Sequence, residues 1–175
     1  MRKLVKRQRK KGFRPFIFTD GVYSMDGDIV NLPLILKIAK KHNAFTAIDE
    51  AHALGVIGTT GKGTEEHFGI RPEEGVDAVM GTLSKSPGLI GGYVAGNEKM
   101  ICYLRHYAAP YIFSTSMPPG IAAACKKAFD IISTNNERRH SLTKNWQYFK
   151  KELLKFEFKD KRIQRLNHHL LNKIE

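Results

Sequence analysis

Two short segments of the chain carry residue types that could do chemistry together. The first is Asp49-Glu50-Ala51-His52, which follows an apolar run at 45–48. The second is centred on Lys85, which follows the apolar run 76–83 and has small residues on both sides. Both runs have the length of buried strands, and ligands of open α/β sheets bind at the carboxyl ends of the strands. We therefore expect the side chains of Asp49 and Lys85 to converge on one crevice.

A carboxylate and a lysine amine in one crevice are the groups that pyridoxal 5'-phosphate (PLP) requires. The lysine forms a Schiff base with the aldehyde, and the carboxylate keeps the pyridine nitrogen protonated. His52, three residues after Asp49, could turn toward the phenolic oxygen of the ring, and the hydroxyl of Thr82 could reach the phosphate. A lysine that such a crevice desolvates can act as an amine nucleophile. The alternative for a single lysine, an exposed loop residue without chemistry, stays open at this point.

Two other interpretations of these segments fail because residues that they require are missing from the sequence. The string at 49–52 also occurs as the acidic box of a class of helicases, which needs a phosphate-binding loop upstream. The nearest such loop, 58–64, lies downstream, and Gly63 stands where a Ser or Thr must reach the metal. A zinc site would need three or four ligands, whereas Asp49 and His52 supply two.

The segments that must position these residues alternate between strand and helix patterns. Short apolar runs predict strands at 16–19, 45–48, 76–83 and 93–95. Amphipathic or capped stretches predict helices at 1–11, 33–42, 97–107, 119–133 and 137–156, with a further helical turn near 65–68. Strands separated by helices imply an α/β fold with a mostly parallel sheet covered on both faces, a three-layer α/β/α arrangement. The tail 157–175 permits one more amphipathic helix.

Charge is distributed unevenly along the 175 residues, which carry a net charge of +12. Residues 1–14 hold eight basic residues and no acidic one, residues 15–134 hold ten basic and twelve acidic, and residues 135–175 hold eleven basic and five acidic. The basicity thus belongs to two flanks, which we interpret as solvated helix faces. Nucleic-acid binding through these flanks is the distant alternative.

Cysteine content and hydropathy indicate the setting of the protein. Cys102 and Cys125 form no metal-binding or disulfide pattern, so we expect two thiols in a reducing, cytoplasmic compartment. No stretch approaches the roughly 18 consecutive apolar residues of a membrane span.

Four motifs, in chain order, closely resemble the α-oxoamine synthases, which are PLP-dependent acyltransferases of the class I/II aminotransferase superfamily. They lie at 23–28 (YSMDGD), 48–58 (IDEAHALGVIG), 82–85 (TLSK) and 112–119 (IFSTSMPP). The resemblance covers about residues 1–155. It implies part of the large domain of fold-type I PLP enzymes over 1–135, followed by a basic helical segment and divergent tail over 136–175.

The resemblance also implies a role for each matching residue. Lys85 would carry the Schiff base, and Asp49 would pair with the pyridinium nitrogen. His52 and Ser24 would bond the phenolic-oxygen side of the ring, and Thr82 would help to hold the phosphate. Lys85, His52 and Asp49 are accordingly the expected catalytic residues, and all five are expected to bind the cofactor.

The implied reaction is a decarboxylative condensation of a small amino acid with an acyl-CoA, in a homodimer. Full-length members of the family are longer than this chain. The resemblance implies that a ring-stacking histidine, a phosphate-binding turn and a small domain lie outside these residues. We therefore expect an uncovered sheet edge and an apolar face. The alternative function is a catalytically incomplete remnant, or an interaction module that needs a partner chain.

Overall fold

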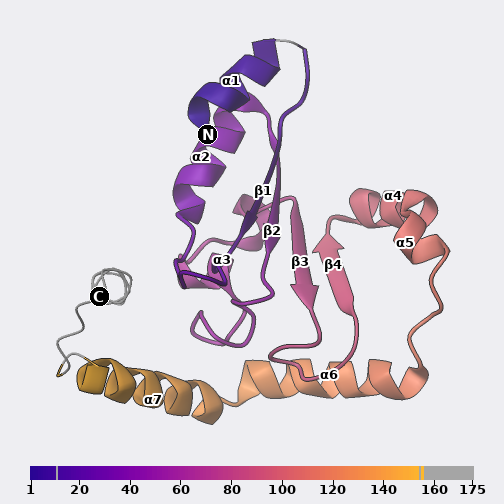
Figure 1. The fold of residues 1–175 in the computed structure, drawn as a ribbon. Helices are drawn as coiled ribbons and strands as arrows, with labels where there is room; N and C mark the ends of the chain where they lie inside the picture. Colours follow the sequence, from indigo (N-terminus) through magenta and orange to yellow (C-terminus); the bar gives the residue numbers. More distant parts are fainter. Residues whose placement is uncertain (11, 154, 156–175) are drawn as a thin grey trace.

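A computed structural model describes residues 1–10, 12–153 and 155 (Figure 1). Its strands are β1 (Phe16–Asp20), β2 (Phe45–Asp49), β3 (Ala78–Thr82) and β4 (Gly92–Gly96). Its helices are α1 (Arg2–Lys10), α2 (Leu32–His42), α3 (Thr64–His67), α4 (Glu98–Tyr107), α5 (Ala109–Ile112), α6 (Pro119–Thr134) and α7 (Glu137–Leu153), with a 3-10 turn at Pro72–Glu74.

The order of strands and helices expected from the sequence is confirmed, with ends that shift by a few residues. The single turn α5 and the 3-10 turn were not expected, because neither is long enough to show a helical period. The expected helix in the tail 157–175 lies outside the described residues.

The four strands form one sheet in the order β1-β2-β3-β4. β1, β2 and β3 are parallel, and their register pairs Asp20 with Asp49 and Asp49 with Met80. β4 is antiparallel to β3, because the short loop between them contains no crossover helix. The mostly parallel sheet is thus confirmed, and the carboxyl ends of β1, β2 and β3 meet at one edge.

One face of the sheet packs against helices and holds the core (Figure 1). α2 begins at Asn31, whose side-chain Oδ1 accepts a hydrogen bond of 3.1 Å from the backbone N–H of Leu34. It ends at Asn43, which adopts the left-handed conformation with φ 47°. The buried residues of this core come from α1, α2, the first two strands and the short segments that flank α2: Val5, Ile17, Val30, Leu32, Ile35, Ala39, Ala44 and Ile48.

The opposite face of the sheet is largely uncovered in the described part of the chain. Side chains alternate along a strand, so Phe16 and Phe18 project on this face, where they are 62% and 55% exposed. They line an apolar groove of about 500 Å³ that also receives residues of α4 at its margin. Among the described residues, the helical cover expected on both faces is thus seen on one face only, where α1 and α2 pack, and the expected apolar face is confirmed.

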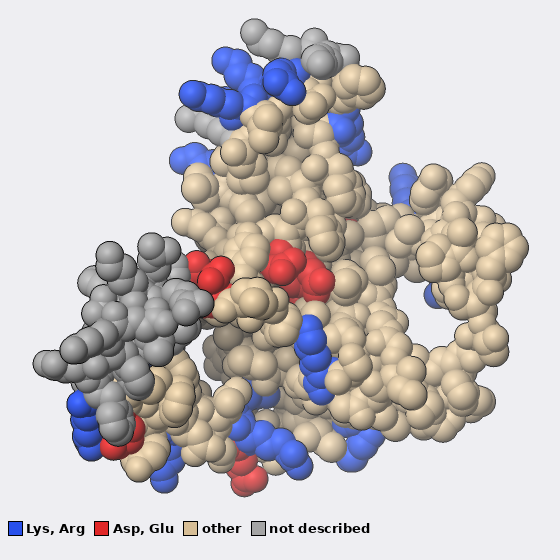
Figure 2. Space-filling model, in the orientation of Figure 1, with Lys and Arg blue, Asp and Glu red and all other residues tan. Residues whose placement is uncertain are grey.

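Basic side chains gather at the two ends of the molecule. Figure 2 shows Lys and Arg over α1 at one end and along α6 and α7 at the other, with acidic side chains between them. This arrangement agrees with the charged flanks seen in the sequence. Among the helices of the described ranges, none combines the length and the apolarity needed to cross a bilayer.

Candidate active site

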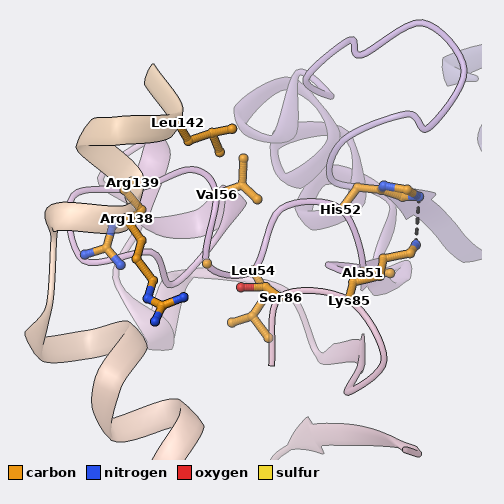
Figure 3. A pocket seen from close by; sticks show the side chains of 10 residues that line it. Ala51, His52, Leu54, Val56, Lys85, Ser86, Arg138, Arg139 and Leu142 are labelled. Carbon is orange, nitrogen blue, oxygen red and sulfur yellow. Dashed lines mark hydrogen bonds between the residues drawn. The ribbon is translucent and has the colours of Figure 1, made fainter. Parts of the chain in front are cut away.

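Lys85 and His52 meet at the carboxyl edge of the sheet. Lys85 Nζ and His52 Nε2 lie 2.7 Å apart, within hydrogen-bond distance. Figure 3 shows the two side chains pointing toward one another. Lys85 lies just beyond β3 and His52 just beyond β2. Because β2 and β3 are parallel neighbours, the loops that follow them leave the sheet side by side.

Both side chains of this pair are exposed. The described residues therefore leave the Lys85 amine open to solvent, and desolvation of this lysine, which the sequence left as one possibility, is not seen in them. An exposed amine is nevertheless accessible to an incoming carbonyl group.

Asp49 lies at the same edge, as the sequence predicts. It is the last residue of β2, and its Oδ1 accepts a hydrogen bond of 2.8 Å from the backbone N–H of Ala51. Its backbone carbonyl accepts a second bond of 2.8 Å from Gly21 N–H, just beyond β1. These bonds fix the turn from Asp49 into the loop that carries His52.

Thr82 and Ser24 have different surroundings. The Thr82 hydroxyl lies 2.8 Å from Ser84 Oγ and accepts a bond of 3.3 Å from Ser84 N–H, so it belongs to the Lys85 loop. Ser24 lies in an exposed turn that follows β1 and is closed by a bridge between Val22 and Ile29. None of the hydrogen bonds in the described ranges joins Ser24 to the other four predicted residues.

A buried carboxylate, that of Glu50, holds the loop that follows β2 in place. Glu50 is 3% exposed, and its Oε2 accepts a hydrogen bond of 3.0 Å from the backbone N–H of Thr64. Burial raises the pKa of the Glu50 carboxyl, and the hydrogen bond from the backbone N–H of Thr64 opposes that rise. The bond ties the loop after β2 to α3 across 14 residues of sequence.

Glycines make room for this carboxylate. A Cβ at Gly21 would lie 2.2 Å from Thr64 Oγ1, and a Cβ at Gly63 would lie 2.1 Å from Glu50 Oε2. No role for Glu50 was predicted from the sequence. The path of the loop brings Thr64 against Glu50, and the residues next to Glu50 in the sequence do not indicate this contact.

A groove of about 280 Å³ extends from the Lys85–His52 pair to the first turns of α7 (Figure 3). The loop 51–56 and Ser86 form its walls, and Arg138 and Arg139 line it from α7. In the sequence, α7 is remote from the predicted site, so these two arginines were not expected there. Only the tertiary structure brings them to the same groove as Lys85.

Comparison with known proteins identifies the family of this chain. The model of the family "Aminotransferase class I and II" matches residues 1–166, and the chain belongs to this family. The chain is 48% identical over 145 residues to 8-amino-7-oxononanoate synthase of Symbiobacterium thermophilum, which covers 83% of this chain and 36% of that protein. It is also 48% identical over 139 residues to 8-amino-7-oxononanoate synthase 1 of Bacillus subtilis, covering 79% of this chain and 35% of that protein.

Solved structures agree with the sequence relatives. The serine palmitoyltransferase of Sphingomonas wittichii has a TM-score of 0.80 at 31% identity, covering 91% of this chain and 40% of that one. A serine palmitoyltransferase of S. paucimobilis, with PLP and myriocin bound, has a TM-score of 0.74 at 34% identity, covering 83% and 38%.

These matches confirm the resemblance to the α-oxoamine synthases and the partial fold-type I domain. The chain spans about 36% of the length of the curated relative from S. thermophilum.

Proposed function

We propose that this chain is the PLP-binding part of an acyltransferase that condenses a small amino acid with an acyl-CoA and releases CO₂. It is closest in kind to 8-amino-7-oxononanoate synthase. The observation that carries the proposal is the 2.7 Å contact between Lys85 Nζ and His52 Nε2 beside Asp49 at one sheet edge. The names of the sequence relatives support the reaction type, and the serine palmitoyltransferase with PLP bound supports the cofactor.

The residues at this edge fit PLP by their chemistry. An exposed primary amine can receive the aldehyde, a carboxylate can pair with the ring nitrogen, and an imidazole lies beside the amine. Lys85 would bind the cofactor, Asp49 would hold its ring nitrogen protonated, and His52 with Ser24 would contact the phenolic-oxygen side. Thr82 would contact the phosphate. When bound, PLP supplies an electron sink for negative charge on the amino acid's α-carbon.

The chain's own residues can carry out the proton transfers. His52 Nε2, 2.7 Å from Lys85 Nζ, can accept a proton from the amine and leave it able to act as a nucleophile. The same Lys85 Nζ, as a free amine, would be able to remove the α-proton of the amino acid as a general base. The carboxylate of Asp49, held by the Ala51 N–H, would pair with the cationic ring nitrogen.

We also propose the division into residues 1–135 and 136–175. It falls between the end of α6 at Thr134 and the start of α7 at Glu137. Free thiols at Cys102 and Cys125 support the cytoplasmic location. The uncovered apolar face supports a homodimer or a complementing chain as the assembled form.

Cofactor attachment tests the proposal directly. The full chain is incubated with PLP, reduced with borohydride and digested, and the pyridoxyl group is located by mass spectrometry. We expect it on Lys85, with attachment abolished in Lys85→Ala. Lys62→Ala is the matched control, because Lys62 is an exposed lysine of the neighbouring glycine-rich loop. Equal labelling of several lysines, or unchanged labelling in Lys85→Ala, would contradict the proposal.

The open apolar face favours a second candidate function, a module that is active only with a partner chain. Size-exclusion chromatography with light scattering separates the two. A monodisperse monomer that attaches PLP at Lys85 and turns over alone would contradict this second candidate.

A further inference from the structure

The groove between Lys85 and α7 has an unbalanced charge. Four of its lining residues carry or can carry positive charge: His52, Lys85, Arg138 and Arg139. None of the residues that line it is acidic. A concave surface with one sign of charge concentrates ligands of the opposite sign.

Arg139 is the strongest sign that an anion belongs here. It is 8% exposed, and among the described residues its side chain donates hydrogen bonds to uncharged acceptors, Ile132 O at 2.5 Å and the side chain of Asn136. Within the described ranges, no carboxylate forms an ion pair with it. A buried cation without a counter-charge is costly, and an anion in the adjoining groove would offset that cost.

The position of Arg139 is also fixed. A Cβ at Gly61 would lie 2.8 Å from its Nη1, so the glycine-rich loop packs directly on the guanidinium. A guanidinium has five N–H donors, so its two bonds leave donors for a ligand. Arg138, the preceding residue, is exposed and lines the same groove. Two neighbouring guanidinium groups suit the bidentate recognition of a carboxylate or phosphate.

We propose that Arg138 and Arg139 bind an oxyanion group of a substrate whose reacting end lies at Lys85. The oxyanion is either a phosphate of CoA or the carboxylate of the amino acid. The inference rests on the proposed function, because the groove shares Lys85 and His52 with the candidate active site.

Isothermal titration of the full chain with CoA, inorganic phosphate and L-alanine tests the proposal and distinguishes the two sources. Binding of CoA and phosphate assigns the site to a phosphate, and binding of alanine alone assigns it to a carboxylate. Arg138→Gln should weaken whichever ligand binds by about tenfold or more, as expected for one charge-assisted hydrogen bond. Lys144→Gln is the matched control, an exposed cation of α7 outside the groove, and should bind like the wild type.

Three results of the titrations would overturn the inference. They are no binding of any of the three probes, unchanged binding in Arg138→Gln, and an equal loss in Lys144→Gln. Circular dichroism verifies that both variants are folded. PLP attachment to Lys85 is measured in parallel at saturating cofactor, and its absence in the wild type is a failure of the proposed function instead. Attachment lost only in Arg138→Gln would also overturn the inference, because the oxyanion would then be the cofactor's own phosphate.

Discussion

Replacing Glu50 with glutamine should stabilise the fold at neutral pH and leave it almost unchanged near pH 4. Glu50 is 3% exposed, and neither its Oε1 nor Thr64 Oγ1 has a hydrogen-bond partner among the described residues. Glutamine has the same shape. Its carbonyl oxygen can keep the bond from Thr64 N–H, and its amide can donate to Thr64 Oγ1.

The sign of the pH effect follows from the environment of the carboxyl. Burial raises the pKa of Glu50, the hydrogen bond from the backbone N–H of Thr64 opposes the rise, and the nearby carboxylates of Glu65 and Asp49 add to it. The folded state therefore binds the proton more tightly than the unfolded state, whose Glu pKa is 4.5. The contribution of Glu50 to the stability of the wild type is therefore fully present below that value and is lost as pH rises through the folded pKa.

The magnitude is set by the buried acceptor that lacks a partner. Such a group costs about 1–3 kcal/mol, and each unit of pKa elevation corresponds to about 1.4 kcal/mol. We expect Glu50→Gln to raise the free energy of unfolding by about 1–3 kcal/mol above the folded pKa. Below the unfolded pKa both proteins hold a neutral side chain, so the difference should approach zero.

Urea unfolding between pH 4 and pH 8, followed by the fluorescence of Trp146 and by circular dichroism, measures this difference. Glu73→Gln is the control, because Glu73 is exposed and paired only with Arg71 on the surface, and its curve should parallel the wild type. If Glu50→Gln is less stable than the wild type at neutral pH, or if the difference is the same at every pH, the buried charge is compensated and the reasoning is refuted.

Three further substitutions test the elements around the site. Gly21→Ala places a Cβ 2.2 Å from Thr64 Oγ1, so thermal unfolding should show a loss of about 1–3 kcal/mol; a neutral result would mean that the Thr64 side chain moves freely. Asp77→Ala removes bonds of 2.8 and 2.9 Å from Thr46 N–H and Oγ1, which tie β3 to β2; we expect a loss of about 2–3 kcal/mol in urea, and Asp77→Asn should recover part of it. Phe18→Lys places a charge on the apolar face, where Phe18 is 55% exposed; light scattering should show weaker self-association, and an unchanged association constant would exclude this face from the contact.

Local pattern accounts for much of the fold. Strands β1, β2 and β4 are short apolar runs, and α2 is an apolar stripe with Asn31 at its start, so each could be found from neighbouring residues alone. Three predicted strands separated by helical segments also imply parallel pairing. That pairing in turn places Asp49 and the Lys85 loop at one edge, since carboxyl ends of parallel neighbours coincide.

Other features depend on contacts between distant residues and have no local signal. Glu50 is buried because the loop after β2 returns to bring Thr64 against it, 14 residues later. Lys85 is exposed. The residues around it in the sequence do not indicate whether distant segments cover its side chain.

The order of strands and helices and the pairing of Lys85 with the Asp49–His52 segment were thus determined by the sequence itself. Residue type and spacing carry that information. The open apolar face, the buried Glu50 and the arginines at the far end of the groove were decided by the tertiary structure. Each depends on how loops and α7 pack across the sheet, and packing between distant segments is set by the shape of the whole fold.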